Sequence, residues 1–534
     1  MGTRIPTSGT DWGVKQLAIR ISILLVVSGA VYVWRPLFHG VFYRMLNSPG
    51  GALVGGLTLL AVVVAFLAPP LDRSAVDSIQ TKLTLVGVVL VIGVVLALVV
   101  GIPANSLEQR TMAEQTMDGA VEVDEFPAIN AENPRIAPRD VADVQTRGSV
   151  SYRQYRLGES DIARMEDGRL AWSYPIEPDG FRNSIYENQQ GVLMSDMTNM
   201  ENREIQAFDD QPFAVGEGML FHRSAEWNLK KTDYWAQYND DPIEFVHDGD
   251  AYMAYPKTGH EWHWTPVPHT TPTWEGVALV HTDGTIEHLS PEQAQESEIL
   301  AGQRLYPLSN TALEMNSLGY RNGIINQLSV VGAHEGHVEV ASLPAGAGNS
   351  QPFVIDLADE QLSYVTAMEP HGEDTRGLDE VWFVDAYTGE FQYFATGSET
   401  LTGPERAMGI VRSADSRTGW GDNFVVIEPV PVTVDAELWW HSKVVPTDNT
   451  DITRNVFVNA HTGEAVEIYD TETVREFLAG GDPEAVEEVG TEPADDPDVA
   501  YYIVITGEDG TELDRIPIEP GQNVNIVQNQ EDEE

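Results

Sequence analysis

Three apolar stretches within the first 104 residues constrain this chain most strongly, because no comparable stretch follows them. Residues 83–102 carry no charged side chain, and this length suits a helix that crosses about 30 Å of hydrocarbon. Residues 51–68 are slightly shorter, and residues 17–34 end in Trp34, a residue type that favours the headgroup layer. We therefore expect a membrane anchor over residues 1–104, with transmembrane helices near 17–34, 51–68 and 83–102.

The basic residues around these stretches predict their orientation, because cytoplasmic loops are enriched in Lys and Arg. Five lie on the side of the amino terminus (Arg4, Lys15, Arg20, Arg73 and Lys82) and three on the other side (Arg35, Arg44 and Arg110). This difference predicts a multi-pass protein of the cell membrane whose carboxyl-terminal domain is extracellular. A signal peptide is the alternative interpretation of the first stretch, but no small-residue cleavage site precedes Trp34.

The region after residue 104 is strongly acidic, with 80 Asp and Glu against 24 Lys and Arg, and the whole chain has a formal net charge of -52. Such a surface is tolerated at high ionic strength, where the Debye length falls to about 3 Å at 1 M salt. In this composition the chain resembles proteins of extreme halophiles, such as haloarchaea. The acidic surface excludes nucleic acid as a partner. The absence of cysteine excludes disulfides, thiolate zinc sites and cysteine nucleophiles.

Short apolar runs separated by Asp-Gly, Asn-Asp and Pro-containing breaks fill the soluble region and predict strands and hairpins. One hairpin is expected from residues 276–281 and 285–289. A short helix should follow it, since Ser290 and Gln293 can form a capping box, and a second helix is expected over 309–318. The fold class is therefore α+β, with a mostly antiparallel β soluble domain behind an N-terminal bundle of three transmembrane helices.

Composition divides the soluble region into segments. The expected order is a stalk at 105–150, a β-rich domain at 151–350, two hairpin repeats at 351–478, an acidic linker at 479–499, and a hairpin with an acidic tail at 500–534. The linker is rich in Glu, Asp, Pro and Gly, so we expect it to be disordered.

One internal repeat lies within this region. Residues 381–390, Val-Trp-Phe-Val-Asp-Ala-Tyr-Thr-Gly-Glu, return 74 residues later as 455–464, with six of ten positions identical. Each copy predicts a strand, a tight turn in which Gly389 or Gly463 takes a positive φ, and a return strand. The ending Val-Asp/Asn-Ala-x-Thr-Gly-Glu resembles the closing hairpin of PepSY modules, small α+β units found outside the membrane. The resemblance implies a module that binds ligands or regulates a peptidase, and not a catalyst.

Three histidines, His260, His263 and His269, are the best candidate metal ligands in the sequence. The first two are three residues apart, and a third imidazole could complete a zinc site with one position left for water. His334 and His337 form a second, shorter pair. The alternative interpretation is that these imidazoles pack beside aromatic side chains in a β-rich surface.

Calcium is the other metal that the sequence allows. Two Asp-rich loops, at 239–241 and 448–451, offer oxygen ligands, although neither fits the twelve-residue loop pattern of calcium-binding hands. We expect no cofactor. The alternatives are zinc bound by the histidines or calcium bound by these loops.

No catalytic motif such as a nucleophile elbow or a Walker loop accompanies these features. We therefore expect a protein that contacts the lipid bilayer and binds or scaffolds membrane or surface proteins. One alternative is a metal-dependent surface hydrolase that uses His260, His263 and His269.

A second alternative is an accessory subunit of a membrane transport or secretion complex. Small residues four apart, Gly51 with Gly55 and Gly93 with Ala97, let helix backbones approach closely in lipid. They indicate either docking onto a partner or packing among the chain's own helices.

Overall fold

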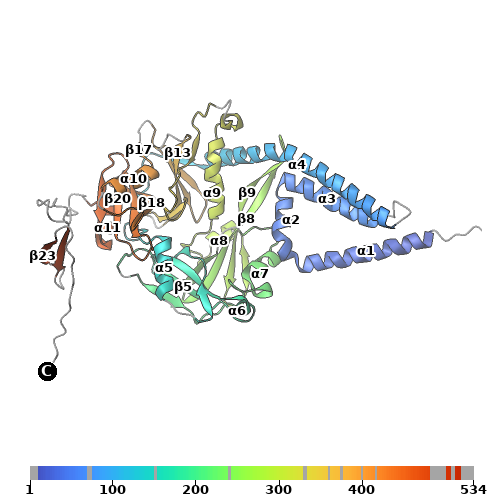
Figure 1. The fold of residues 1–534 in the computed structure, drawn as a ribbon, viewed down its shortest axis with the longest axis horizontal. Coiled ribbons are helices and arrows are strands. Elements are labelled where there is room, and N and C mark those ends of the chain that lie inside the picture. The colour runs from blue at the N-terminus through green and yellow to red at the C-terminus, as the bar shows by residue number, and fades with distance from the viewer. Residues whose placement is uncertain are drawn as a thin grey trace, which may run out of the picture. The chain divides into compact units, whose positions relative to one another are not determined.

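A computed structural model describes residues 10–68, 75–149, 153–201, 203–238, 242–328, 333–358, 361–372, 377–397, 401–414, 418–481, 501–506 and 512–518. The chain divides into two compact units, Met1–Gly481 and Asp482–Glu534. The fold is α+β, with mostly antiparallel sheets behind three long apolar helices (Figure 1). This confirms the predicted fold class.

Three amino-terminal helices are long and apolar enough to cross a membrane, over Gly13–Val33, Pro49–Leu67 and Ile79–Gly119. They belong to α1 (Thr10–Val33), α3 (Pro49–Leu67) and α4 (Ala75–Gly119). The 3₁₀ helix η1 (Arg35–Phe38) and the helix α2 (His39–Leu46) connect α1 to α3 and form a short elbow. The three helices lie where the sequence predicts membrane spans, which indicates association with a membrane.

The helix α4 continues beyond the predicted third span. Pro103 lies inside it, and residues 105–119, expected as the start of an irregular stalk, are helical. Met112 and Ala113 are buried because this half of α4 packs against α9 (Leu308–Ser317) and β9 (His269–His281). Tertiary packing therefore extends the helix into the soluble region.

The small residues of the spans pack against the chain's own helices. A Cβ atom on Gly51 would lie 2.7 Å from the carbonyl oxygen of Arg44 in α2. A Cβ atom on Gly93 of α4 would lie 3.5 Å from the Cα atom of Val54 in α3. This favours packing within the chain as the role of both small-residue pairs.

Two antiparallel sheets follow α5 (Arg139–Ser149). The first contains β2 (Tyr155–Leu157), β3 (Asp161–Arg164), β4 (Leu170–Pro178), β5 (Val192–Asp196) and β6 (Ile205–Phe208), and the second contains β7 (Ile243–His247), β8 (Asp250–His263), β9 and β10 (Ile286–Leu289). The helices of this part are α6 (Phe181–Tyr186), η2 (Phe221–Arg223), α7 (Ala225–Thr232) and α8 (Pro291–Gln295). One core, which includes Met194, Phe245 and Met253, joins the two sheets.

The hairpin and helices predicted here are confirmed. β9 pairs with β10, so that Val280 lies opposite Ile286. Ser290 caps α8, and Gln293 completes the capping box. The helix α9 begins and ends one residue before the predicted bounds.

The 74-residue repeat belongs to a larger structural repeat. The first copy is a four-stranded antiparallel meander of β12 (Phe353–Asp356), β13 (Leu362–Pro370), β15 (Glu380–Asp385) and β16 (Phe391–Ala395), and the second is a meander of β18 (Phe424–Val434), β19 (Glu437–Pro446), β20 (Arg454–Asn459) and β21 (Ala465–Ile468). β1 (Val121–Val123) and β11 (Val338–Val340) extend the first sheet to six strands.

Short elements surround the two meanders. They are η3 (Leu318–Tyr320), η4 (Ile324–Gln327), β14 (Gly377–Leu378), β17 (Leu401–Thr402), α10 (Pro404–Ala414) and α11 (Thr471–Leu478). The helix α10 packs on the second meander, and β14 pairs with β17.

Both copies close with the same turn. The side chain of Asp385 accepts hydrogen bonds from the N–H groups two and three residues later, at 2.7 and 2.9 Å. Asn459 accepts the equivalent pair at 2.9 Å each. Gly389 and Gly463 follow with φ of 78° and 77°. The predicted hairpins and their glycine positions are confirmed.

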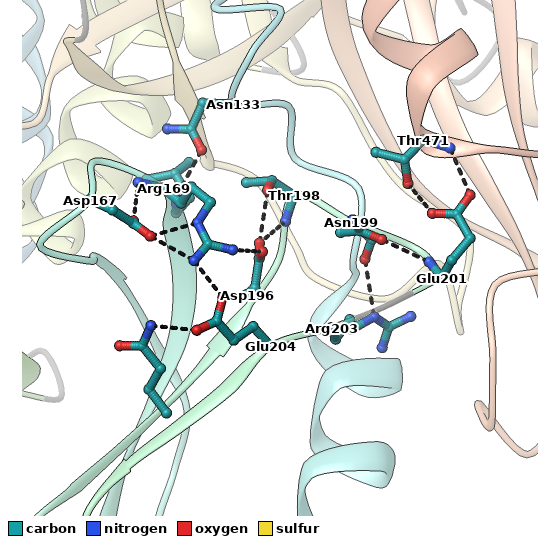
Figure 2. A network of polar contacts seen from close by, with 12 residues as sticks. Asn133, Asp167, Arg169, Asp196, Thr198, Asn199, Glu201, Arg203, Glu204 and Thr471 are labelled. Atoms are coloured by element: carbon teal, nitrogen blue, oxygen red, sulfur yellow. Dashed lines mark hydrogen bonds and ion pairs between the residues drawn. The ribbon is translucent and has the colours of Figure 1, made fainter.

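Figure 2 shows a network of polar contacts in which one arginine contacts several carboxylates. The Arg169 guanidinium forms ion pairs at 2.5–2.7 Å with the carboxylates of Asp167, Asp196 and Glu204. Nearby, Glu201 accepts hydrogen bonds from the N–H and the hydroxyl of Thr471, at 2.9 and 2.6 Å. These bonds connect the loop after β5 to the start of α11.

The second unit contains β22 (Tyr501–Thr506) paired antiparallel with β23 (Glu512–Ile518). This confirms the predicted final hairpin. Residues 482–500, which include most of the predicted acidic linker, and the acidic tail at 519–534 lie outside the described residues.

Candidate metal centre

The three histidines that the sequence favours lie on the long β8–β9 hairpin. His263 on β8 is directly opposite His269 on β9, and their rings stack with centroids 5.0 Å apart. His260 instead contacts Tyr43 of α2, with ring centroids 5.4 Å apart. Among the described residues these three do not form a group whose ligand atoms all lie within 4.8 Å of one another. Zinc binding by this set stays a prediction.

Two of these imidazoles connect the hairpin to the anchor. Nδ1 of His260 lies 2.9 Å from the hydroxyl oxygen of Tyr43, and Nε2 of His269 lies 2.8 Å from that of Thr111 on α4. Burial lowers the pKa of His260, which favours its neutral form. The two side chains therefore join the soluble region to α2 and α4.

The Asp-rich loops have different outcomes. Residues 239–241 lie outside the described residues. In the second loop, Asp448 Oδ1 accepts from the hydroxyl of Thr450 at 2.9 Å, and Asp451 Oδ1 accepts from the N–H of Ile452 at 2.8 Å. These are local turn contacts, and calcium binding stays a prediction.

A different group of histidines meets at the edge of the six-stranded sheet. His334, His337 and His371 each offer a ring nitrogen within 4.8 Å of the other two. His337 directly precedes β11, and His371 directly follows β13. Because Val338 pairs with Pro370, the two histidines arrive at the same end of this strand pair.

The loop before β11 is held in an unusual backbone conformation. Asn322 Nδ2 donates to the carbonyl of Glu335 at 2.8 Å. Asn326 donates to the same carbonyl at 3.0 Å and accepts from the N–H of Glu335 at 3.2 Å. His334 and Gly336 have φ of 53° and 56°, the left-handed region that is costly for a non-glycine residue. The amide contacts thus fix the loop and the position of His334.

Glu339 determines which nitrogen His371 offers. Its Oε2 atom lies 3.0 Å from Nδ1 of His371. Because a carboxylate only accepts hydrogen bonds, this contact places a proton on Nδ1, and in the neutral imidazole Nε2 then keeps its lone pair. Histidines that bind metals usually have such a carboxylate partner, which orients the ring and increases its basicity.

The spacing suits a tetrahedral ion once one ring turns. Zn–N bonds of about 2.0–2.1 Å place ligand nitrogens roughly 3.3 Å apart. The Nδ1 atoms of His334 and His337 are 3.5 Å apart. The rings of His337 and His371 are stacked at 4.1 Å and 10°, so their lone pairs cannot meet at one ion without a ring rotation. His371 is exposed and has room to turn.

The electrostatic surroundings favour neutral His337. Burial is the main cause that lowers its pKa. The charges of His371, His334 and Arg321 lower it further, whereas Glu339 raises it. His337 is 9% exposed, whereas His334 is half-buried and His371 is exposed. Neutral imidazole is the form that binds metals, and the exposed side lets an ion enter from solvent.

The sequence identified part of this group. His334 and His337 stand out as a pair, but His371 is 34 residues away and has no ligand motif of its own. It joins the pair only because β11 pairs with β13. A correct prediction of that strand pairing would have been needed to find the third histidine.

A scan of the chain against models of protein families finds no match, and a search of curated proteins finds no matching sequence. The resemblances to PepSY modules and to proteins of halophiles therefore stay predictions.

Proposed function

We propose that this chain is a membrane-anchored, extracytoplasmic binding protein that holds a divalent transition metal ion, zinc first among them, at His334, His337 and His371. The observation that carries the proposal is the approach of three imidazole nitrogens to within 4.8 Å of one another. Imidazole suits zinc, copper and nickel, and Glu339 supplies the carboxylate partner that such sites use.

The outward orientation is supported by two cations of the anchor. Arg20 Nη1 and Lys82 Nζ donate to the carbonyl of Ala68, at 2.6 and 2.5 Å. Ala68 is the C-cap of α3, at the end remote from the elbow. Cations at this end are stabilised by the helix dipole. Both charges thus gather on the side of the amino terminus, as expected for a cytoplasmic face.

Metal analysis of the purified full chain tests the proposal. We expect about one bound zinc ion per chain, lost in His334→Ala and in His371→Ala. The double variant His263→Ala/His269→Ala is the matched control and should retain the ion. Loss of zinc from the control alone would move the site to the β8–β9 hairpin and overturn the proposal.

Orientation needs a separate test, which the absence of cysteine makes simple. A single cysteine at Tyr469, which is 51% exposed, should react with a membrane-impermeant maleimide in intact cells. Reaction only after lysis would place the domain in the cytoplasm and leave the metal proposal standing.

A protein partner is the second part of the proposal. Phe181 and Tyr186 on α6 are 74% and 71% exposed, a pair of large aromatic side chains that favours contact with another surface. Mass spectrometry of proteins that co-purify with the chain, compared with the variant Phe181→Ser/Tyr186→Ser, tests this. The same proteins at the same yield from both preparations would contradict a contact through α6.

The grouping of three histidines also favours a metal-dependent hydrolase as a second candidate. Three protein ligands leave the fourth tetrahedral position for water, which zinc can activate. Hydrolysis of ester or peptide substrates by the zinc-loaded chain, abolished in His371→Ala, would support it. An inactive preparation that holds stoichiometric zinc would favour binding alone.

A further inference from the structure

The lysines of this chain are unevenly placed. There are six: Lys15 and Lys82 in the anchor, Lys257 and Lys443 buried in the soluble region, and Lys230 and Lys231 together in α7. Lys231 is exposed, and Lys230 is half-buried beside Glu226. In a chain of net charge -52, the accessible lysines of the soluble region are thus confined to one short helix.

That helix is fixed to the end of the first span. Trp34 and Trp227 of α7 make an edge-to-face contact with ring centroids 5.8 Å apart. The guanidinium of Arg35 donates to the carbonyl oxygen of Lys231. Since Trp34 directly follows α1, these contacts hold α7 at the level where the span ends.

The segment after α7 is held at the same level. Nε2 of His39, the first residue of α2, lies 3.0 Å from the carbonyl oxygen of Ala236. The ring of His39 contacts Tyr234 edge-on at 5.2 Å, and Tyr234 contacts Trp235 at 5.4 Å. Trp235 itself is 62% exposed.

Together these elements form one exposed surface, here called the elbow surface, made of Trp34, Leu37, Phe38, Val41, Lys231 and Trp235. It combines tryptophans with a cation, the pattern typical of the membrane–water boundary. It is also continuous with the spans, because four of its members belong to the segment that connects α1 to α3. They are Trp34, Leu37, Phe38 and Val41.

We infer that the elbow surface lies in the headgroup layer and contacts anionic lipid. Trp34 and Trp235 place their rings among the headgroups, and Lys231 meets lipid phosphates. The inference rests on the proposed membrane anchor. It means that the soluble region stands directly on the bilayer, held by α7, and not away from it on a stalk.

Nitroxide labels on single cysteines in the full chain, reconstituted in nanodiscs, test this. The positions are Trp235, Val62 in α3 as the lipid reference, and Tyr469 as the aqueous control. Tyr469 lies beside α11, which Figure 1 places far from α1. We expect the ratio of oxygen to nickel-chelate accessibility at Trp235 to exceed that at Tyr469 and to approach that at Val62. Lys231→Glu should shift the Trp235 label toward water in anionic nanodiscs only.

Four other results would contradict the inference or the anchor on which it rests. Equal ratios at Trp235 and Tyr469, with Val62 in lipid, would overturn the inference while the anchor stands. Shielding of Trp235 from both reagents would also overturn it, because protein would then cover the surface. A Trp235 label that ignores Lys231→Glu in anionic nanodiscs would contradict the contact with lipid phosphate. An aqueous ratio at Val62 would contradict the anchor itself.

Discussion

At the scale of single residues, Glu339 shows how one side chain sets the chemistry of another. Its carboxylate contacts Nδ1 of His371, so in the neutral imidazole Nε2 is the nitrogen left to bind a metal ion. Glu369 lies opposite Glu339 in the β11–β13 pair, but it accepts from the N–H of Ser342 at 3.1 Å. Two neighbouring carboxylates therefore have different roles.

Glu339→Gln should weaken zinc binding roughly 10–100-fold, because a neutral amide orients His371 less firmly and lowers its basicity. Glu369→Gln is the matched control and should bind zinc as the unaltered chain does. Competition with a zinc-chelating dye measures both affinities. Equal losses in the two variants would contradict the assigned role of Glu339.

Lys443 is the residue most at odds with its surroundings. It is fully buried on β19, and its Nζ has no hydrogen-bond partner among the described residues. Its pKa is lowered to about 7, chiefly by burial, with a raising effect from Glu428 and a smaller lowering effect from Arg135. The neighbouring His441 is also fully buried, with its pKa well below the usual range.

This burial makes stability depend on pH. Between pH 7 and the unfolded pKa of about 10.4, the unfolded chain binds a proton at Lys443 that the folded chain does not. The free energy of unfolding should therefore rise with pH across this window. Below pH 7 the folded chain also carries the proton, so the full cost of burying the charged Lys443 applies. Lys443→Met should remove this part of the slope and raise stability at pH 7, measured by denaturant unfolding. A Met variant with an unchanged slope would contradict this.

At the scale of elements, the sequence was most informative where local chemistry decides the structure. The capping box of Ser290 and Gln293 and the glycines of the repeated turns depend on neighbours in sequence, and the structure confirms them. The extension of α4 to Gly119 and the arrival of His371 beside His337 depend on distant packing partners. No local pattern encodes those partners, so the sequence alone predicts an irregular stalk where α4 continues and identifies only two of the three clustered histidines.

The two repeated turns offer a matched pair of substitutions. Gly389 and Gly463 share the same positive φ, but a Cβ atom on Gly389 would overlap the ring of Tyr306, whereas one on Gly463 would lie 3.5 Å from Ile410. Gly463→Ala should lower the free energy of unfolding by about 1–2 kcal/mol through backbone strain alone. Gly389→Ala should cost more. Thermal or denaturant unfolding measures both, and equal costs would show that Tyr306 moves aside freely.

At the scale of the whole molecule, the dominant property is charge. Arg169 forms ion pairs with three carboxylates at once, as expected where acidic side chains outnumber basic ones. The remaining carboxylates repel one another over a Debye length of about 10 Å at 0.1 M salt and about 3 Å at 1 M. The folded state should therefore gain from salt.

The melting temperature of the full chain in detergent should rise between 0.1 and 1 M sodium chloride. Sucrose at equal osmolality is the control, because it does not screen charge and should reproduce only part of the rise. A melting temperature that is indifferent to salt would argue against the halophilic interpretation of the composition.

His334, His337 and His371 are proposed to hold one metal ion through three imidazoles. X-ray absorption at the zinc edge of the zinc-loaded full chain tests this coordination. We predict three nitrogen ligands at about 2.0 Å, with the scattering pattern of imidazole, and one further light ligand. A shell of oxygen atoms without imidazole scattering, or an imidazole signal that survives in His334→Ala/His371→Ala, would overturn the proposed site.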